Sequence, residues 1–236
     1  VARVRRVVST RAGGRSRGVY STFNLSAGVG DDPAAVAANR ARLTAELGVP
    51  VVFLQQVHGT RVVVVDTPPV AGDPDRPDAD AVVTARPGIG VAVLAADCVP
   101  VLLADPRAGV VGAAPAGGVG GAGGVLPAVV PAMPDLGARP AAIEVLLGPA
   151  VCGGCYEVPA AMRAEVDARL PGSAVRTRSG TPGLDLRAGL YHQLVELGIG
   201  RVGADPRCTV EDRALYSHRR DGRTGRQAAI TWLDPS

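Results

Sequence analysis

The sequence predicts one layered α/β domain built on mixed β-sheets. The chain has 236 residues and 47% hydrophobic content, enough to bury one sizeable core. Short β-branched runs separated by Gly, Pro and Asp dominate its middle, and helical spacing of apolar residues occurs on both sides. No internal repeat or linker divides the chain. We therefore expect a single domain over residues 1–236.

Three helices are expected from spacing and end signals. The first covers residues 32–47, opens with an acidic cap and a proline, and meets Gly48, a typical helix stop. The other two cover residues 159–170 and 186–197, and each ends just before a glycine-containing turn. These helices flank the predicted strands in sequence.

Seven strands are expected, six in the middle of the chain and one at its end. They cover residues 51–55, 61–66, 81–84, 91–95, 101–104, 110–114 and 228–233. Between them, residues 66–80 read as a Pro- and Asp-rich surface loop, and residues 117–124 are rich in glycine.

Charge and composition narrow the partners and the compartment. The net charge of +3 is spread along the chain without a long basic block, so we predict no nucleic-acid partner. The N-terminus lacks the apolar region of a signal peptide and no membrane-length apolar span follows, so we expect a cytoplasmic protein without membrane association. Four cysteines in a chain of this length do not form a disulfide framework, and we expect them to be reduced thiols.

Three segments place reactive side chains where a predicted strand ends, a common position for functional residues. They carry His58, Cys98 and the Arg-rich turn 219–226. Imidazole and thiolate could bind zinc together or act as a base and nucleophile pair, and their spacing does not choose between these. The plainer alternatives are a surface histidine, a small buried thiol and a polar turn.

Cys152 and Cys155 form a C-x-x-C pair. Because a structural zinc site needs a second pair of ligands, simple packing is favoured over a metal or redox role for these two thiols.

The motifs together resemble one family over nearly the whole chain: the YfiH-like proteins, once called polyphenol oxidases and now described as zinc-dependent purine nucleoside phosphorylases. Gln-Val-His-Gly at 56–59, Ala-Asp-Cys-Val-Pro at 96–100 and Ser-His-Arg-Arg-Asp-Gly at 217–222 carry much of the likeness. The other matching segments are residues 10–20, 24–25, 30–33, 39–40, 78–80, 148–149, 155–158, 208–209 and 224–226.

This resemblance implies an α/β/β/α layered fold and a monomer or weak homodimer. It implies that His58 and Cys98 are catalytic and hold a zinc ion together with a third histidine. The implied reaction is phosphorolysis of adenosine, inosine, guanosine and methylthioadenosine, with adenosine deamination as a second activity. Zinc suits both because an open position can bind phosphate or lower the pKa of water to about 7. The residues implied to contact substrate are Arg11, Asn24, Arg219 and Arg220.

The third ligand motif departs from the family pattern. Where the family has Ala-His-Ala-Gly-Trp-Arg-Gly, residues 114–120 read Ala-Pro-Ala-Gly-Gly-Val-Gly. Pro115 offers no metal ligand, Gly118 no aromatic wall and Val119 no cation. We therefore expect weak or absent zinc binding and impaired catalysis.

Three functions stay open. The chain could be a working zinc phosphorylase, a degenerate relative that serves as a binding or scaffold protein, or a metal-free hydrolase of Cys98 and His58 acting on cell-wall precursors. Asp97 argues against the last, because an adjacent carboxylate raises a thiol pKa. Neither His192 nor His218 is expected to replace the missing ligand. We predict that His58 and Cys98 converge on one cleft, bordered by the turn 219–226.

Overall fold

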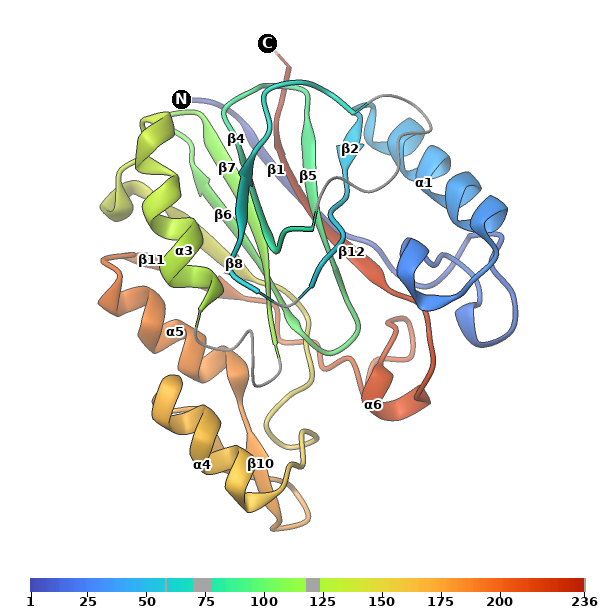
Figure 1. Ribbon diagram of the computed structural model, residues 1–236, viewed down its shortest axis with the longest axis vertical. Coiled ribbons are helices and arrows are strands. Elements are labelled where there is room, and N and C mark those ends of the chain that lie inside the picture. The colour runs from blue at the N-terminus through green and yellow to red at the C-terminus, as the bar shows by residue number, and fades with distance from the viewer. Residues whose placement is uncertain (58, 70–77, 118–123, 236) are drawn as a thin grey trace.

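Two β-sheets packed face to face form the middle of the molecule in the computed structural model, which describes residues 1–57, 59–69, 78–117 and 124–235 (Figure 1). One sheet has the strand order β1-β12-β5-β2, and the other has the order β11-β8-β6-β7-β4-β3. Their bounds are β1 Val4–Val8, β2 Val51–Val52, β3 Val62–Val64, β4 Ala81–Thr84, β5 Gly90–Ala95, β6 Val99–Asp105, β7 Val110–Ala116, β8 Glu144–Leu147, β11 Arg201–Ala204 and β12 Gln227–Leu233.

Helices cover the outer face of each sheet (Figure 1). α1 (Pro33–Leu47) packs on the four-stranded sheet, and α3 (Val125–Ala132) and α5 (Leu186–Glu196) pack on the six-stranded sheet. α4 (Ala160–Arg169) contacts the small hairpin of β9 (Ala174–Arg176) and β10 (Pro182–Leu184). The layers therefore run α/β/β/α with mixed sheets, which confirms the predicted fold class. Within the described ranges, no helix combines the length and apolarity needed to cross a membrane.

Both faces of the central strands are buried. On β5, Val91 and Val93 belong to the core between the sheets, while Ala92 and Leu94 belong to the core under α1. Successive side chains of a strand point to opposite faces, so a strand covered on both sides needs apolar residues throughout. This explains why the sequence shows continuous apolar runs in its middle.

The predicted helices agree closely with the structure. Asp32 caps α1 by accepting the Ala34 N–H at 2.9 Å, and Gly48 ends it with a left-handed φ of 70°. The prediction missed α3, whose sequence contains two prolines and follows the glycine-rich stretch. Residues 70–77 of the predicted loop and residues 118–123 of the glycine-rich stretch lie outside the described residues.

The predicted strands are also present, although β2 and β3 are shorter than expected. The prediction missed β1, β8 and β11, together with the small hairpin of β9 (Ala174–Arg176) and β10 (Pro182–Leu184). β1 and β11 lie at the edges of their sheets and contain arginine, so their sequences lack an apolar run.

The β6–β7 hairpin determines what lies beside Cys98. Its strands pair antiparallel from Val99 opposite Ala116 to Asp105 opposite Val110. Cys98 directly precedes β6 at the open end of this hairpin, where β7 also ends. At the closed end, the buried Asp105 carboxylate accepts three backbone N–H groups at 2.9 to 3.0 Å.

We expect Asp105→Asn to weaken the fold in a pH-dependent way. Burial alone would raise the pKa of Asp105, but N–H groups of Arg139, Ala108 and Arg107 hold this pKa below its usual value. The stabilisation is therefore full above the usual aspartate pKa and is lost as the pH falls through the lower folded-state value. Urea unfolding at pH 7 should show that the variant loses about 1–3 kcal/mol of the free energy of unfolding. This difference from the parent protein should become smaller in acid. The exposed control Asp66→Asn should change little, and a pH-independent loss for Asp105→Asn would contradict the mechanism.

Candidate functional site

The turn between β5 and β6 has a strained backbone. Asp97 has a φ of 99°, and it is the non-glycine residue with a left-handed φ among those described. Such a conformation costs on the order of 1–3 kcal/mol and persists only where the surroundings hold it. Strain of this kind is common at functional sites.

Three hydrogen bonds from separate segments hold Asp97 in place. Its Oδ1 accepts from the Thr209 hydroxyl at 2.6 Å, and its Oδ2 accepts from the Arg219 N–H at 2.6 Å. Its carbonyl oxygen accepts from the Val151 N–H at 3.1 Å. Because Cys98 follows directly, these bonds restrain the backbone that carries its thiol.

Cys98 is a partly buried, unbridged thiol. Burial raises the pKa of Cys98, and the charge of Asp97 raises it further, while Arg226 acts in the opposite direction. The thiol is therefore protonated at neutral pH. A raised pKa disfavours Cys98 as a free nucleophile, as the neighbouring carboxylate predicts.

The third motif lies directly against Cys98. Pro115 is buried in β7 opposite Pro100, and its ring nitrogen has no lone pair for a metal. Gly117 follows β7, and a Cβ placed on it would overlap the Cys98 Sγ. Gly118 and Val119 lie outside the described residues. Position 115 therefore offers no metal-ligating atom at a strand end that adjoins Cys98.

The Gln-Val-His-Gly segment at 56–59 reaches the same end of β5 through Gln56 and Val57. His58 itself lies outside the described residues. Gln56 pairs with the backbone of Leu94, donating from Nε2 at 3.0 Å and accepting at Oε1 at 2.7 Å. Val57 donates its N–H to Asp80 Oδ1 at 3.0 Å. The convergence of His58 and Cys98 remains a prediction.

The Arg-rich turn contacts the turn that carries Cys98, whereas its place beside a cleft with His58 remains a prediction. It contains α6 (His218–Asp221), which begins where Ser217 Oγ accepts the Arg220 N–H. Besides its backbone bond to Asp97, Arg219 is exposed and holds its guanidinium 5.0 Å from the centre of the Tyr156 ring. This places a cation and an aromatic face beside Cys98.

Arg220 points back into the protein. Its guanidinium donates to carbonyl oxygens of the loop that precedes α6, including those of Thr209 at 2.7 Å and Leu215 at 2.8 Å. It also pairs with Asp221 at 2.7 Å. These contacts hold together the loop that carries Thr209, the partner of Asp97.

Asn24 and Arg11 are likewise occupied by the protein. Both ends of the buried Asn24 carboxamide are bonded, its Oδ1 accepting the Arg226 N–H at 2.9 Å and its Nδ2 donating to Asp31 at 2.9 Å. Arg11 donates to the Ser21 carbonyl at 3.0 Å and lies 4.9 Å from the centre of the Tyr216 ring. His218 Nδ1 lies 2.7 Å from the Gly222 carbonyl oxygen, at the end of α6.

The described side chains around Cys98 do not complete a metal site. Of the three positions that the family resemblance implies, Cys98 has a ligand, Pro115 has none and His58 lies outside the described residues. The part of the chain that the structure describes does contain one compact group of three or more metal-ligating side chains, and Cys98 is not in it. That group joins the C-x-x-C pair to Cys208 and Glu211, whose matching spacing was the overlooked signal in the sequence.

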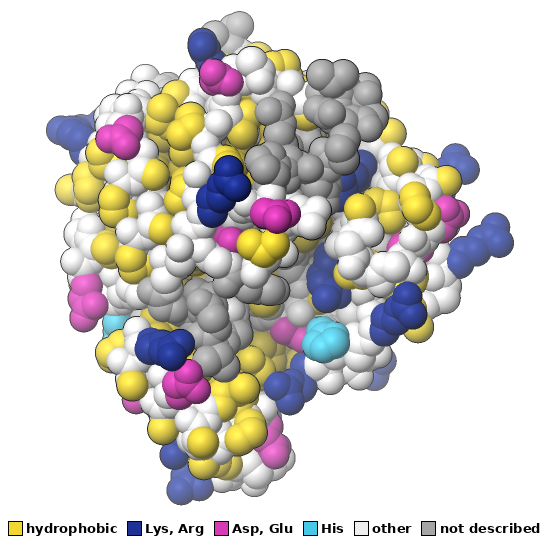
Figure 2. Space-filling view, in the orientation of Figure 1, with side chains coloured by type: hydrophobic (Ala, Val, Ile, Leu, Met, Phe, Trp, Pro, Cys, Tyr) yellow, Lys and Arg dark blue, Asp and Glu magenta, His cyan; other side chains and the backbone are white. Residues whose placement is uncertain are grey.

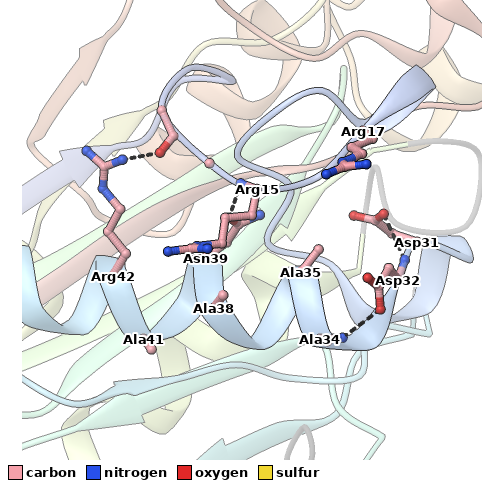
Figure 3. A pocket seen from close by; sticks show the side chains of 12 residues that line it. Arg15, Arg17, Asp31, Asp32, Ala34, Ala35, Ala38, Asn39, Ala41 and Arg42 are labelled. Atoms are coloured by element: carbon pink, nitrogen blue, oxygen red, sulfur yellow. Dashed lines mark hydrogen bonds between the residues drawn. The ribbon is translucent and has the colours of Figure 1, made fainter.

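A separate groove of about 1180 Å³ lies between α1 and the N-terminal loop (Figure 3). Small alanines of α1 form its floor, and Arg15, Arg17 and Arg42 line it together with Asp31 and Asp32. Among the described residues, its lining includes neither Cys98 nor Arg219 and carries no thiol or histidine. Its residues therefore do not add to the chemistry at the β5–β6 turn.

Charged side chains are scattered over the face shown in Figure 2, where arginines alternate with acidic residues. This distribution matches the sequence, in which basic residues form no long block.

Comparison with known proteins agrees with the family resemblance. The family model described as multi-copper polyphenol oxidoreductase laccase matches residues 5–234. The chain therefore belongs to this family. It is 54% identical over 235 residues to a protein named purine nucleoside phosphorylase from Mycobacterium tuberculosis, covering 98% of this chain and 93% of that protein. A protein of the same name from Corynebacterium glutamicum is 49% identical over 233 residues, with 98% and 94% covered.

Solved structures confirm the YfiH-like fold. YlmD from Geobacillus stearothermophilus superimposes with a TM-score of 0.89 at 31% identity, covering 98% of this chain and 92% of that one. The hypothetical protein YfiH from Bacillus licheniformis gives a TM-score of 0.86 at 29% identity, with 98% and 93% covered.

We expect Asp97→Asn to lower the pKa of Cys98. Asparagine tolerates a left-handed φ, and its amide can bond to both Thr209 and Arg219, so the turn is kept while the charge is removed. Because burial remains, the pKa should fall without reaching that of an exposed thiol. The measurement is the pH midpoint of Cys98 alkylation, resolved by mass spectrometry, with Glu157→Gln as a matched control. An unchanged pH midpoint with a faster alkylation rate at high pH would contradict the prediction, because that result would mean that the thiol had become more accessible while its pKa stayed the same.

Proposed function

We propose that this chain is a purine nucleoside phosphorylase of its family whose catalysis is impaired by Pro115. The observation that carries the proposal is the 54% identity, over 98% of the chain, to proteins of that name. The implied substrates are phosphate and adenosine, inosine, guanosine or methylthioadenosine, with adenosine deamination as the second activity. The impairment follows from a buried proline at a position where the family pattern has a metal ligand.

Arg219 is the best-placed residue for binding phosphate. Its guanidinium is exposed beside the Cys98 turn, and guanidinium groups bind phosphate through paired, charge-assisted hydrogen bonds. The ring of Tyr156 under Arg219 could also stack with a purine base. Arg11, Asn24 and Arg220 would then act by positioning the segments that surround the substrate.

Zinc would supply a Lewis acid at this site. Only His58 and Cys98 remain to hold it there, and a two-ligand site binds zinc weakly. We also propose that the protein works in the cytoplasm as a monomer or weak dimer, without membrane partners. We propose no nucleic-acid partner either, which the scattered distribution of its charges supports.

The hydrolase alternative has less support. A nucleophilic Cys98 would need a lowered thiol pKa, whereas burial and Asp97 raise it.

Restoring the third ligand should strengthen zinc binding at this site. Pro115→His returns an imidazole to the end of β7, next to the Cys98 turn, and we expect zinc to bind at least about 10-fold more tightly there. Calorimetric titration measures this, and repeating it with Pro115→His in a Cys98→Ser background tests whether the gain belongs to this site. Equal affinities in the parent and Pro115→His would show that position 115 is not a ligand position.

Turnover should need more than the metal. We expect phosphate-dependent release of adenine or hypoxanthine to be slow in the parent and in Pro115→His, and to rise when Gly118→Trp and Val119→Arg are added. Absence of phosphorolysis from the parent and the triple variant alike would favour a binding or scaffold protein. A parent as fast as the triple variant would overturn the proposed impairment.

A further inference from the structure

We infer that Cys152, Cys155, Cys208 and Glu211 form a structural zinc site, distinct from the candidate active site and independent of the proposed activity. The three sulfur atoms and one carboxylate oxygen all lie within 4.8 Å of one another. In a tetrahedral site with Zn–S bonds of about 2.3 Å, sulfur atoms lie about 3.8 Å apart. The four side chains therefore need to close by only about 1 Å around an ion.

The ligands come as two pairs with the same spacing, Cys-x-x-Cys and Cys-x-x-Glu. Each pair lies on a tight turn of the same kind. The Cys152 carbonyl accepts N–H groups of residues 155 and 156 at 2.9 and 3.0 Å, and the Cys208 carbonyl accepts those of residues 211 and 212 at 3.1 and 2.8 Å. Such paired turns bring the first and fourth side chains to one side, as structural zinc sites require.

The two turns are held against each other by backbone bonds. Cys208 forms a parallel bridge with Ala150, and the Thr209 N–H donates to the Ala150 carbonyl at 3.1 Å. The Cys152 N–H donates to the Cys208 sulfur at 3.3 Å. A backbone N–H aimed at a sulfur stabilises a thiolate, the form that binds metal. The ligand set is thus brought together by the fold before any ion binds.

The ligand chemistry points to zinc. Three thiolates and a carboxylate with no open position suit Zn²⁺ in a closed tetrahedral site, whereas Mg²⁺ and Ca²⁺ prefer oxygen ligands. Arg178 lies at the edge, where its guanidinium contacts Glu211 and donates to the Cys155 sulfur at 3.3 Å. Its positive charge would offset part of the excess negative charge of four anionic ligands around one divalent ion.

This site would brace the segments that surround Cys98. Thr209, next to the ligand Cys208, donates to Asp97, and Tyr156, next to the ligand Cys155, lies beneath Arg219. An ion binding both turns would fix these two contacts. Its role would therefore be structural, with an effect on the Cys98 turn through its neighbours.

The test is the metal content of the full-length chain, purified without a chelator or a histidine tag. We expect about one equivalent of zinc in the parent and in Cys98→Ser, and we expect Cys208→Ser to lose it, with an affinity loss above the roughly 10–100-fold typical of an outer-shell partner. Glu211→Cys should retain zinc with a fourth thiolate. Zinc lost in Cys98→Ser but kept in Cys208→Ser would overturn the assignment.

A second measurement does not depend on a variant that must fold. In the parent protein, Zn²⁺ should protect residues 152, 155 and 208 from alkylation, as resolved by mass spectrometry, and should not change the alkylation of Cys98. A chelator should remove the protection. Replacement by Co²⁺ should give the charge-transfer absorption of several thiolates in a tetrahedral field. Zinc-independent alkylation, or a disulfide within the group in protein purified without oxidant, would overturn the proposal.

Discussion

The Asp97 carboxylate stabilises a strained turn whose left-handed backbone is unfavourable for a non-glycine residue. Its two oxygens and its carbonyl accept hydrogen bonds from Thr209, Arg219 and Val151, which lie in three separate segments. The segments are also joined to one another, since the Thr209 N–H donates to the Ala150 carbonyl and Arg220 donates to the Thr209 carbonyl, so together they offset the cost of a left-handed aspartate. The position of Cys98, and of the cation and aromatic ring beside it, depends on this convergence.

The β6–β7 hairpin supplies the other constraint. Its register brings Pro115 opposite Pro100 and Gly117 against Cys98, so the third motif is next to the thiol whatever residue it carries. The fold therefore accommodates a proline where the family resemblance implies a ligand, and the two-ligand site that we propose there would hold zinc weakly. A scaffold and a ligand set are separate requirements, and in our proposal this chain meets the first more fully than the second.

Local signals predicted much of the fold and part of the site. The Asp32 cap and the Gly48 stop located α1 because capping acts within one turn of a helix. The doubly buried strands were visible as apolar runs, but the edge strands β1 and β11 were not, since arginine on a solvent-facing edge carries no such signal.

Contacts between segments far apart along the chain could not be predicted from the local sequence. Nothing near Asp97 in the sequence indicates Thr209 as its partner, and nothing near Cys155 indicates Cys208, which lies 53 residues away along the chain. The spacing Cys-x-x-Glu at 208–211 repeats that of Cys-x-x-Cys at 152–155 and could have indicated a second ligand pair. It was missed because the fourth position is Glu and not Cys. The occupied side chains of Asn24 and Arg220 could be found only from their bonds.

Our central claim is that the chain holds its metal at the Cys152, Cys155, Cys208 and Glu211 group more strongly than at Cys98. Anomalous diffraction at the zinc edge, from crystals grown without added metal, tests it most directly. We predict one strong peak among those four side chains and little or none at Cys98. A fully occupied peak at Cys98, with none at the other group, would contradict the claim.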